Sequence, residues 1–163
     1  MAWLLPPRTA APETLQVLIQ AVRNREAIEI RYQSMTDPKA SWRWISPHAF
    51  ASDGRRWHVR AYCHTRKDFR DFVIGRIETT RKRKPSEIEP ELDHDWHTRI
   101  DVTLIPNPAL SLEQQEAIAY EYRMSRSKQL KLSVRKSLLF YLERQLAWAP
   151  ETPEARQIVI SYD

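Results

Sequence analysis

Two arginines, Arg70 and Arg76, are the residues of this sequence best suited to bind an anion. They share the parity of Phe72 and Ile74, so a continuous strand would place two permanent cations at the ends of a partly buried face. Unpaired charges are costly there, whereas guanidinium groups bind phosphates and carboxylates through paired hydrogen bonds. Either nearby acids neutralise both arginines, or the face is a cleft that receives an anion. The nearby acids are Asp68, Asp71 and Glu78.

The spacing of the two arginines limits what they can bind together. On a straight strand they would lie ~20 Å apart, which is too far to grip one phosphate. Gly75, one of only two glycines in the chain, can bend the strand and shorten this distance. The preceding run, 57–63, alternates in the period of a half-buried strand, and a polar turn at 64–68 joins it to the run 69–78. The two runs therefore predict a hairpin that positions both arginines, with Trp57 in the core.

Catalytic and metal-binding patterns find little support. The sequence has no glycine-rich phosphate loop and no nucleophile elbow. Cys63 and His64 are adjacent on a predicted strand, where neighbouring side chains point to opposite faces. The segment 94–97 contains two histidines but no third ligand at a metal-site spacing, so a linker or capping role is expected for it. We therefore expect neither an enzyme nor a bound cofactor or metal.

Charge is divided unevenly along the chain. Residues 1–90 contain 17 Lys and Arg against 10 Asp and Glu, whereas residues 91–163 contain 9 against 11. This asymmetry suggests two modules, of which only the first meets a polyanion. The basic run 81–84 is either a solvated linker or a phosphate-contacting patch, and it has no aromatic residues of its own for stacking. A single cysteine, the lack of a long apolar run and the lack of a signal-peptide pattern predict a soluble, cytoplasmic protein.

The hydrophobic pattern predicts an α+β chain with two modules. A helix is expected from Pro12 to about Asn24, followed by about five short strands, the order of a small, strongly bent barrel. Pro47 is expected to end regular pairing of the second strand. From Arg99 the pattern predicts β-α-β-α-β, a separate α/β module in which Ser111 opens the first helix. We expect an N-terminal lead at 1–11, a barrel domain at 12–84, a linker at 85–98 and a C-terminal module at 99–163.

The first module resembles WYL domains. Trp57-His58-Val59 stands at the position of the Trp-Tyr-Leu signature, and 70–77 resembles the Arg-x-Phe…Arg-Ile segment of the family. Upstream, Arg43-x-Ile45-x-Pro47-His48 matches the arginine and proline spacing. The departures are His58 and Val59 in the signature, together with Val73 and Gly75, where many members have Arg and Asp. The resemblance implies an Sm-like, SH3-type barrel.

The second module resembles the C-terminal extension of WYL transcriptional regulators. The similar segments are 107–115 and 134–141. The combination is most similar to regulators of phage-defence islands, whose extension dimerises, so a homodimer is implied. Such regulators begin with a winged helix-turn-helix, which this sequence does not show. The chain is expected to be either a fragment of a repressor or a freestanding sensor, and operator DNA is expected as a partner only if the full-length protein has a DNA-binding domain.

The resemblance also implies a ligand site on the barrel. The residues at the matching positions are Tyr32, Ser46, His48, Arg70 and Arg76. Guanidinium groups can grip phosphate, His48 and Ser46 add donors, and Tyr32 adds a stacking surface. Three of these residues also have an interpretation without a ligand: Tyr32 as a core residue, Ser46 as a hydrogen-bond donor in a turn, and His48 as an isolated polar residue. Trp42, Arg43 and Trp44 are further candidates for stacking or phosphate contacts.

The function expected from these observations is an effector-sensing and dimerising portion of a transcriptional regulator. Its ligand would be a nucleotide or a short single-stranded nucleic acid, and binding would change the dimer geometry by a population shift. The alternative is an adaptor whose basic face docks an acidic partner without a small-molecule ligand. A third interpretation, an RNA-binding Sm-like module without a regulatory role, predicts single-strand binding that is not coupled to dimer geometry.

Overall fold

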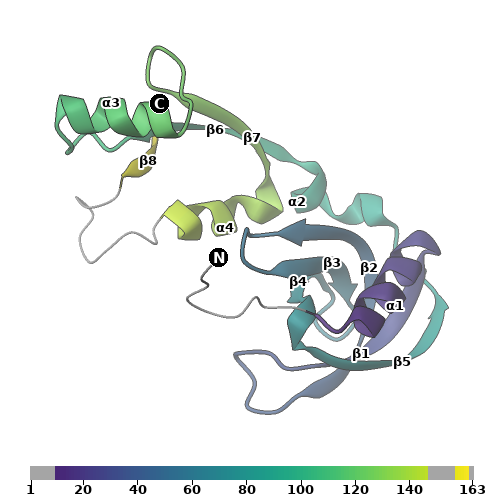
Figure 1. Ribbon diagram of the computed structural model, residues 1–163. Coiled ribbons are helices and arrows are strands. Elements are labelled where there is room, and N and C mark those ends of the chain that lie inside the picture. Colours follow the sequence, from purple (N-terminus) through teal and green to yellow (C-terminus); the bar gives the residue numbers. More distant parts are fainter. Residues whose placement is uncertain (1–9, 147–156, 162–163) are drawn as a thin grey trace. The chain divides into compact units, whose positions relative to one another are not determined.

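The computed structural model describes residues 10–146 and 157–161. The chain divides into two compact units, one ending at Leu92 and the other beginning at Asp93 (Figure 1). Within the described residues, no helix is both long and apolar enough to cross a membrane.

The first unit begins with the predicted helix, α1 (Pro12–Arg23). Pro12 suits the first turn, where its missing N–H has no helical partner to lose. One face of the helix buries Thr14, Leu18 and Ala21 against β1, β2 and β5 (Figure 1). The helix ends at Asn24, and Arg25 then takes a positive φ of 53°, which turns the chain into the first strand. The predicted amphipathic helix is therefore confirmed.

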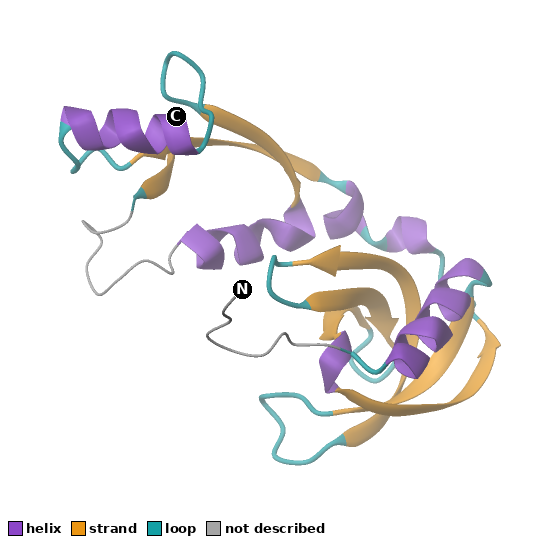
Figure 2. Cartoon of the chain, in the orientation of Figure 1, coloured by secondary structure: helices purple, strands orange, loops and turns teal. Residues whose placement is uncertain are grey.

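Five antiparallel strands form one sheet in the order β4-β3-β2-β1-β5 (Figure 2). Their bounds are β1 (Glu26–Tyr32), β2 (Ser41–Ser52), β3 (Trp57–Cys63), β4 (Asp68–Val73) and β5 (Ile77–Pro85). In the described residues β4 and β5 pair with only one neighbour each, so the sheet is open. The α+β class and the order of elements are thus present, whereas the closed barrel is not observed.

The core of this unit fills the concave side of the sheet. Alternating residues of the strands pack there with Leu18 and Ala21 of α1. The fully buried side chains include Ile28 and Ile30 of β1, Ile45 of β2 and Val59 of β3. Burying each of these side chains contributes roughly 1.5–3 kcal/mol, so this cluster is the main source of stability for the unit.

Three local predictions are wrong in detail. The run 69–78 is not one strand, because a 3-10 turn, η1 (Ile74–Arg76), separates β4 from β5 at Gly75. Pro47 does not end β2, which continues to Ser52 through a register shift between Pro47 and Ala49. Trp57 is 60% exposed and not in the core. It is the first residue of β3 and pairs with Ser52, the last of β2, so it lies at the end of the hairpin.

The basic run 81–84 is also structured. All four residues belong to β5, which pairs with β1 through Arg83 and Lys84. The linker interpretation of this run is therefore wrong. The chain leaves the sheet only after Pro85, where Ser86 N–H donates to the carbonyl of Arg25 at 2.9 Å, and a short turn, η2 (Pro90–Leu92), closes the unit.

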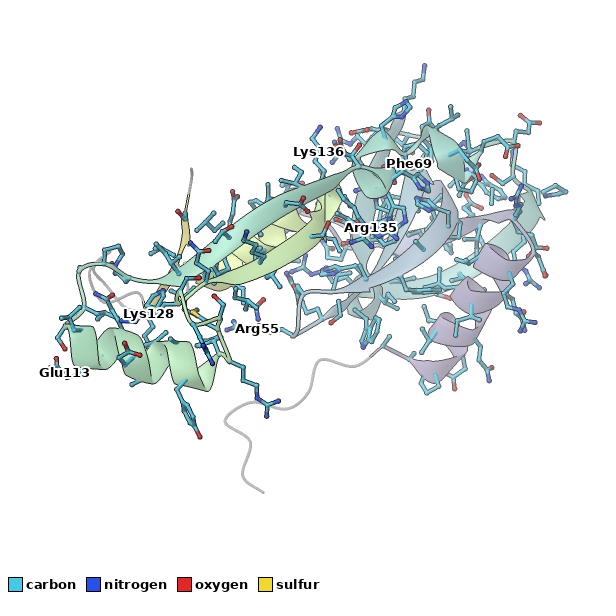
Figure 3. All side chains as sticks on the ribbon, turned by 90° about the horizontal axis from the view of Figure 1, so that it is seen from above. Arg55, Phe69, Glu113, Lys128, Arg135 and Lys136 are labelled. Carbon is cyan, nitrogen blue, oxygen red and sulfur yellow. The ribbon has the colours of Figure 1, made fainter. Side chains whose placement is uncertain are left out.

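The second unit contains the predicted β-α-β-α-β order after a short helix. Its elements are α2 (His94–His97), β6 (Arg99–Pro106), α3 (Leu112–Glu121), β7 (Leu130–Arg135), α4 (Lys136–Leu146) and β8 (Ile158–Ser161). The three strands form an antiparallel sheet in the order β7-β6-β8. Arg135 and Lys136 lie at the β7–α4 junction, and Glu113 lies at the opposite end of this unit on α3 (Figure 3).

Local capping fixes the start of both of its first helices. Ser111 Oγ accepts from Gln114 N–H at 3.2 Å, and Gln114 Oε1 accepts from Ser111 N–H at 2.9 Å, the reciprocal bonds of the predicted capping box. Asp93 caps α2 by accepting from Trp96 N–H, so the segment 94–97 is the short helix that is capped and not the linker or cap that was expected. Leu104, Ile118 and Ile158 form a small buried core for this unit.

Candidate functional site

His48 is presented by a β-bulge in the first unit. Pro47 pairs with Ala61 and Ala49 pairs with Arg60, so His48 is the extra residue that has no partner position on β3. A bulge changes the direction of the side chain and bends its strand. The imidazole is half-buried and meets the ring of Phe69 edge-on, with 5.6 Å between ring centroids. The bulge therefore positions a polar ring away from the regular pleat.

A cavity of about 250 Å³ lies beside this bulge. Two residues of the predicted site, Ser46 and His48, line it together. The remaining lining comes from α1 and the turn after it, from β2 and β4, and from the segment after β5, namely Val22, Arg25, Pro47, Phe69, Ser86, Ile88, Pro90 and Glu91. The volume is slightly below the usual range for small-molecule sites, about 300–1,000 Å³, so it suits a fragment such as one base or one sugar phosphate.

A short hydrogen-bond chain crosses the floor of this cavity. Ser86 Oγ donates to Ser46 Oγ at 2.8 Å, and Ser46 Oγ lies 2.9 Å from Nε2 of His64. Burial, and to a smaller extent the cation of Lys84, lowers the pKa of His64, so its ring is neutral at pH 7. Ser86 Oγ also accepts from Ile88 N–H at 3.1 Å. Ser46 is thus a buried strand residue that holds the segment after β5.

Tyr32 belongs to the core rather than to an open stacking surface. Its side chain is 7% exposed, and its ring meets Phe72 edge-on at 5.1 Å. The hydroxyl accepts a hydrogen bond from Val73 N–H at 3.2 Å. This bond connects the end of β1 to the end of β4, two strands that are not neighbours in the sheet. The structure therefore favours the packing interpretation of Tyr32.

Arg70 and Arg76 make no ion pair and no hydrogen bond through their side chains within the described residues. Arg70 is exposed on β4, and Arg76 is half-buried in η1. Two of the three nearby acids are engaged elsewhere, since Asp71 pairs with Arg60 at 3.4 Å and Glu78 pairs with Arg31 at 2.7 Å. Neither arginine lines the cavity beside His48. The predicted five-residue site is therefore distributed over three places, with both guanidinium groups unneutralised.

A buried histidine of the first unit, His58, interacts electrostatically with Arg76. His58 is 1% exposed, and burial is the main cause that lowers its pKa, with a smaller contribution from Arg56 and Arg76. The carboxylates of Asp53 and Asp71 oppose this shift. Asp53 itself has a lowered pKa: burial opposes its ionisation, but the N–H groups of Arg55 and Arg56 stabilise the carboxylate.

Trp42 and Trp44 form an aromatic and cationic face with β5. The guanidinium of Arg81 stacks on Trp42 at 3.8 Å from its centroid, and the ammonium of Lys84 lies 5.0 Å from that of Trp44. Arg81 also donates to both carboxylate oxygens of Glu29, at 2.6 and 2.8 Å, and this hydrogen bonding lowers the pKa of Glu29. The run 81–84 contains no aromatic residue, but Trp42 and Trp44 of β2 provide aromatic partners for Arg81 and Lys84.

Sequence reasoning missed several members of these sites. Arg81 was grouped with its neighbours in the chain, although Glu29 on β1 and Trp42 on β2 share its face of the sheet. Arg43 was grouped with Trp42 and Trp44, but it points to the other side, where its guanidinium lies 5.5 Å from the Tyr32 ring. The alternation of the three strands contained this signal, but the register of their pairing did not follow from it.

Comparison with known families defines the class of the protein. Residues 13–82 match the model of the WYL domain, and residues 99–162 match that of the BrxR transcriptional regulator, C-terminal dimerization domain. Each match covers one of the two units almost completely. The chain thus contains a WYL domain followed by a BrxR-type C-terminal dimerization domain, as the sequence resemblance predicted.

The curated relatives are named DNA-binding transcriptional repressor CapW. The protein from Stenotrophomonas maltophilia is 39% identical over 144 residues, which cover 86% of this chain and 47% of the relative. The protein from Escherichia coli strain KTE188 is 37% identical over 152 residues, covering 91% of this chain and 50% of the relative. The chain thus spans about half the length of these relatives. Among solved structures, Proteasome accessory factor B/C (PafBC) of Arthrobacter aurescens aligns with 95% of this chain and 25% of its own, at 18% identity and a TM-score of 0.42.

Proposed function

We propose that this chain is the effector-sensing and dimerising portion of a transcriptional regulator, and that its WYL domain binds a nucleotide or a short single-stranded nucleic acid. The observation behind this proposal is that Arg70 and Arg76 lack an internal counter-ion within the described residues, whereas Arg31, Arg60 and Arg81 of the same unit are paired with carboxylates. Unneutralised guanidinium groups are suited to bind phosphate.

The rest of the proposal follows from the relatives and the domain match. The relatives are named as DNA-binding repressors, so operator DNA is the proposed target of the full-length protein, provided that it contains a DNA-binding domain. The C-terminal unit would pair two copies of the chain. The same proposal includes two further expectations: that the regulator controls a phage-defence island, and that its first unit is of the Sm-like barrel type.

The cavity beside His48 suggests how binding would be transmitted. Ser86, Ile88, Pro90 and Glu91 line this cavity, and they lie in the segment that leads from the sheet to the second unit. A ligand that competes for Ser46 Oγ would break its bond with Ser86 and shift this segment. Because a ligand moves an equilibrium only by its difference in affinity for the two states, the effector must bind one arrangement of the segment more tightly.

Titration of labelled oligonucleotides against salt tests the proposal. Arg70→Ala and Arg76→Ala should each weaken binding and reduce the slope of log affinity against log salt by about 0.7 for a single strand. Arg126→Ala is the matched control, since Arg126 is exposed in the second unit and forms no ion pair or hydrogen bond among the described residues. An unchanged salt slope in both arginine variants contradicts the proposal.

The adaptor function predicts a different result. Of the four cations of β5, Arg81 and Arg83 pair with Glu29 and Glu26. Lys82 and Lys84 form no ion pair with a carboxylate within the described residues. This exposed basic strand would attract an acidic protein. Absence of nucleotide and oligonucleotide binding at low salt, together with binding of an acidic partner that Lys82→Glu abolishes, would favour the adaptor.

A further inference from the structure

A second cavity, of about 320 Å³, lies between the β1–β2 loop and the β3–β4 turn. The two loops and the first residues of β2 provide its lining: Asp37, Pro38, Lys39, Ser41, Trp42, Arg43, Thr65 and Arg66. It shares no lining residue with the cavity beside His48. Ser46, His48, Arg70 and Arg76 do not line it, so an inference about this cavity does not rest on the proposed function.

The charges of this cavity are unbalanced. Lys39, Arg43 and Arg66 supply three cations, and Asp37 supplies the one carboxylate. Both guanidinium groups approach this carboxylate, Arg43 Nη2 at 3.7 Å from Oδ2 and Arg66 Nη2 at 3.9 Å from Oδ1. These distances exceed those of charge-assisted hydrogen bonds, about 2.7–2.9 Å. One carboxylate is therefore shared loosely by two arginines, and the site retains an excess of positive charge.

The guanidinium of Arg43 has a hydrogen-bond donor without an acceptor within the described residues. Its side chain is only 11% exposed, and its Nη2 donates to Ser41 Oγ at 2.6 Å. Its Nε is buried and has no hydrogen-bond partner within the described residues. A buried donor without a partner costs free energy that a suitable acceptor would recover. The guanidinium is held in place by the ring of Tyr32, 5.5 Å away, so this donor is preorganised.

We propose that this cavity is a phosphate-monoester site and that Asp37 is its internal competitor. A phosphate carries more charge than a carboxylate and has three terminal oxygens, so it can accept from Arg43, Arg66 and the hydroxyl of Ser41 or Thr65 at once. The volume is at the low end of ligand cavities, about 300–1,000 Å³. It therefore suits a mononucleotide or the terminal phosphate of a strand.

Asp37 can yield its place without unfolding the loop. Its backbone carbonyl accepts from Gln33 Nε2 at 2.8 Å, and this bond does not involve the carboxylate. The carboxylate is 35% exposed, so it can rotate into water when a phosphate enters. The anion thus replaces a weak, shared ion pair while the loop stays anchored at Gln33.

Calorimetric titration of the full chain with a nucleoside 5′-monophosphate tests the site. Arg66→Gln, which changes a 54% exposed side chain, should weaken binding by about 10-fold or more. Asp37→Asn should tighten it by about 3- to 10-fold, because the internal carboxylate no longer competes. Arg43→Lys should weaken binding although the charge is kept, since the fork and the Nε donor are lost. Arg126→Gln, with the same loss of charge as Arg66→Gln, should leave binding unchanged.

Several outcomes would overturn the inference. These are weaker or equal binding in Asp37→Asn, equal binding of the nucleoside without phosphate, and no heat from the monophosphate at millimolar concentration in low salt. A thermal melt of each variant checks that the unit is folded. Tight binding of a 5′-phosphorylated oligonucleotide, lost without its phosphate, identifies a strand end as the source. Equal affinity for the mononucleotide and the phosphorylated strand identifies the free nucleotide as sufficient. Both of these results support the site, and Arg70→Ala, which acts on the other proposal, should not alter them.

Discussion

Replacing Tyr32 by Phe separates a packing role of this residue from a ligand role. The change removes the hydroxyl that accepts from Val73 N–H at 3.2 Å and keeps the ring that packs on Phe72. A net hydrogen bond is worth about 0.5–1.5 kcal/mol. We therefore expect the free energy of unfolding of the WYL domain to fall by about 1 kcal/mol, and its Tm by about 4–8 °C, the range for a domain of 60–100 residues.

Urea unfolding and native-state hydrogen exchange measure this effect. With a slope of about 2 kcal/mol per molar urea, the midpoint should fall by about 0.5 M, and the Val73 amide should exchange faster. Tyr62→Phe is the control, because Tyr62 lies on the same sheet and its hydroxyl makes no hydrogen bond in the described residues. If Tyr32→Phe leaves the stability unchanged but weakens oligonucleotide binding, the packing role is refuted and Tyr32 is a ligand contact.

Three further predictions concern a helix cap, two histidines with lowered pKa values, and a glycine in a turn. Ser111→Ala should destabilise the C-terminal domain by about 1 kcal/mol and accelerate amide exchange in the first turn of α3; Ser127→Ala, in an exposed loop, should do neither. Burial lowers the pKa of His58 and of His64, so the unfolded chain binds more protons below about pH 6.5 and stability should fall as the pH falls through this range. Denaturation midpoints at pH 7.5 and 5.5 should show this loss, and His64→Gln should reduce it; a pH-independent midpoint would contradict it. Gly54→Ala should lower the free energy of unfolding by roughly 1 kcal/mol, because Gly54 has a φ of 79°, which alanine adopts only with strain. An unchanged urea midpoint would contradict this prediction.

The elements of this fold follow largely from local pattern. The 3.6-residue period of α1 and the helix start at Ser111 were both visible in the sequence, because each depends on residues close in the chain. Pro47 and Trp57 were misjudged for a non-local reason. Whether proline ends a strand depends on which neighbour needs its missing N–H, and whether Trp57 is buried depends on what lies over the end of the hairpin.

The sites were harder to predict because they depend on register. Alternation showed which residues of one strand share a face, but not which strand lies opposite. Arg81, Glu29 and Trp42 meet across three strands, and alternation within each strand does not show this meeting. Arg70 and Arg76 were expected at the two ends of one partly buried strand face, but Arg70 is exposed and Arg76 lies in a 3-10 turn. The turn at Gly75 and the pairing of Asp71 with Arg60 appear only in three dimensions.

The bulge at His48 also constrains how the length of this chain can vary. Loops such as 33–40 can gain or lose residues while the strands on either side keep their faces. Deleting His48 would likewise leave the register of β2 unchanged, because Pro47 and Ala49 would then oppose the consecutive residues Ala61 and Arg60. Phe50 would stay opposite Val59 and against the core, and only the bend of the bulge would be lost. A deletion elsewhere in β2 would exchange the two faces of the strand, so we expect natural variants of this domain to vary in length within β2 only at position 48.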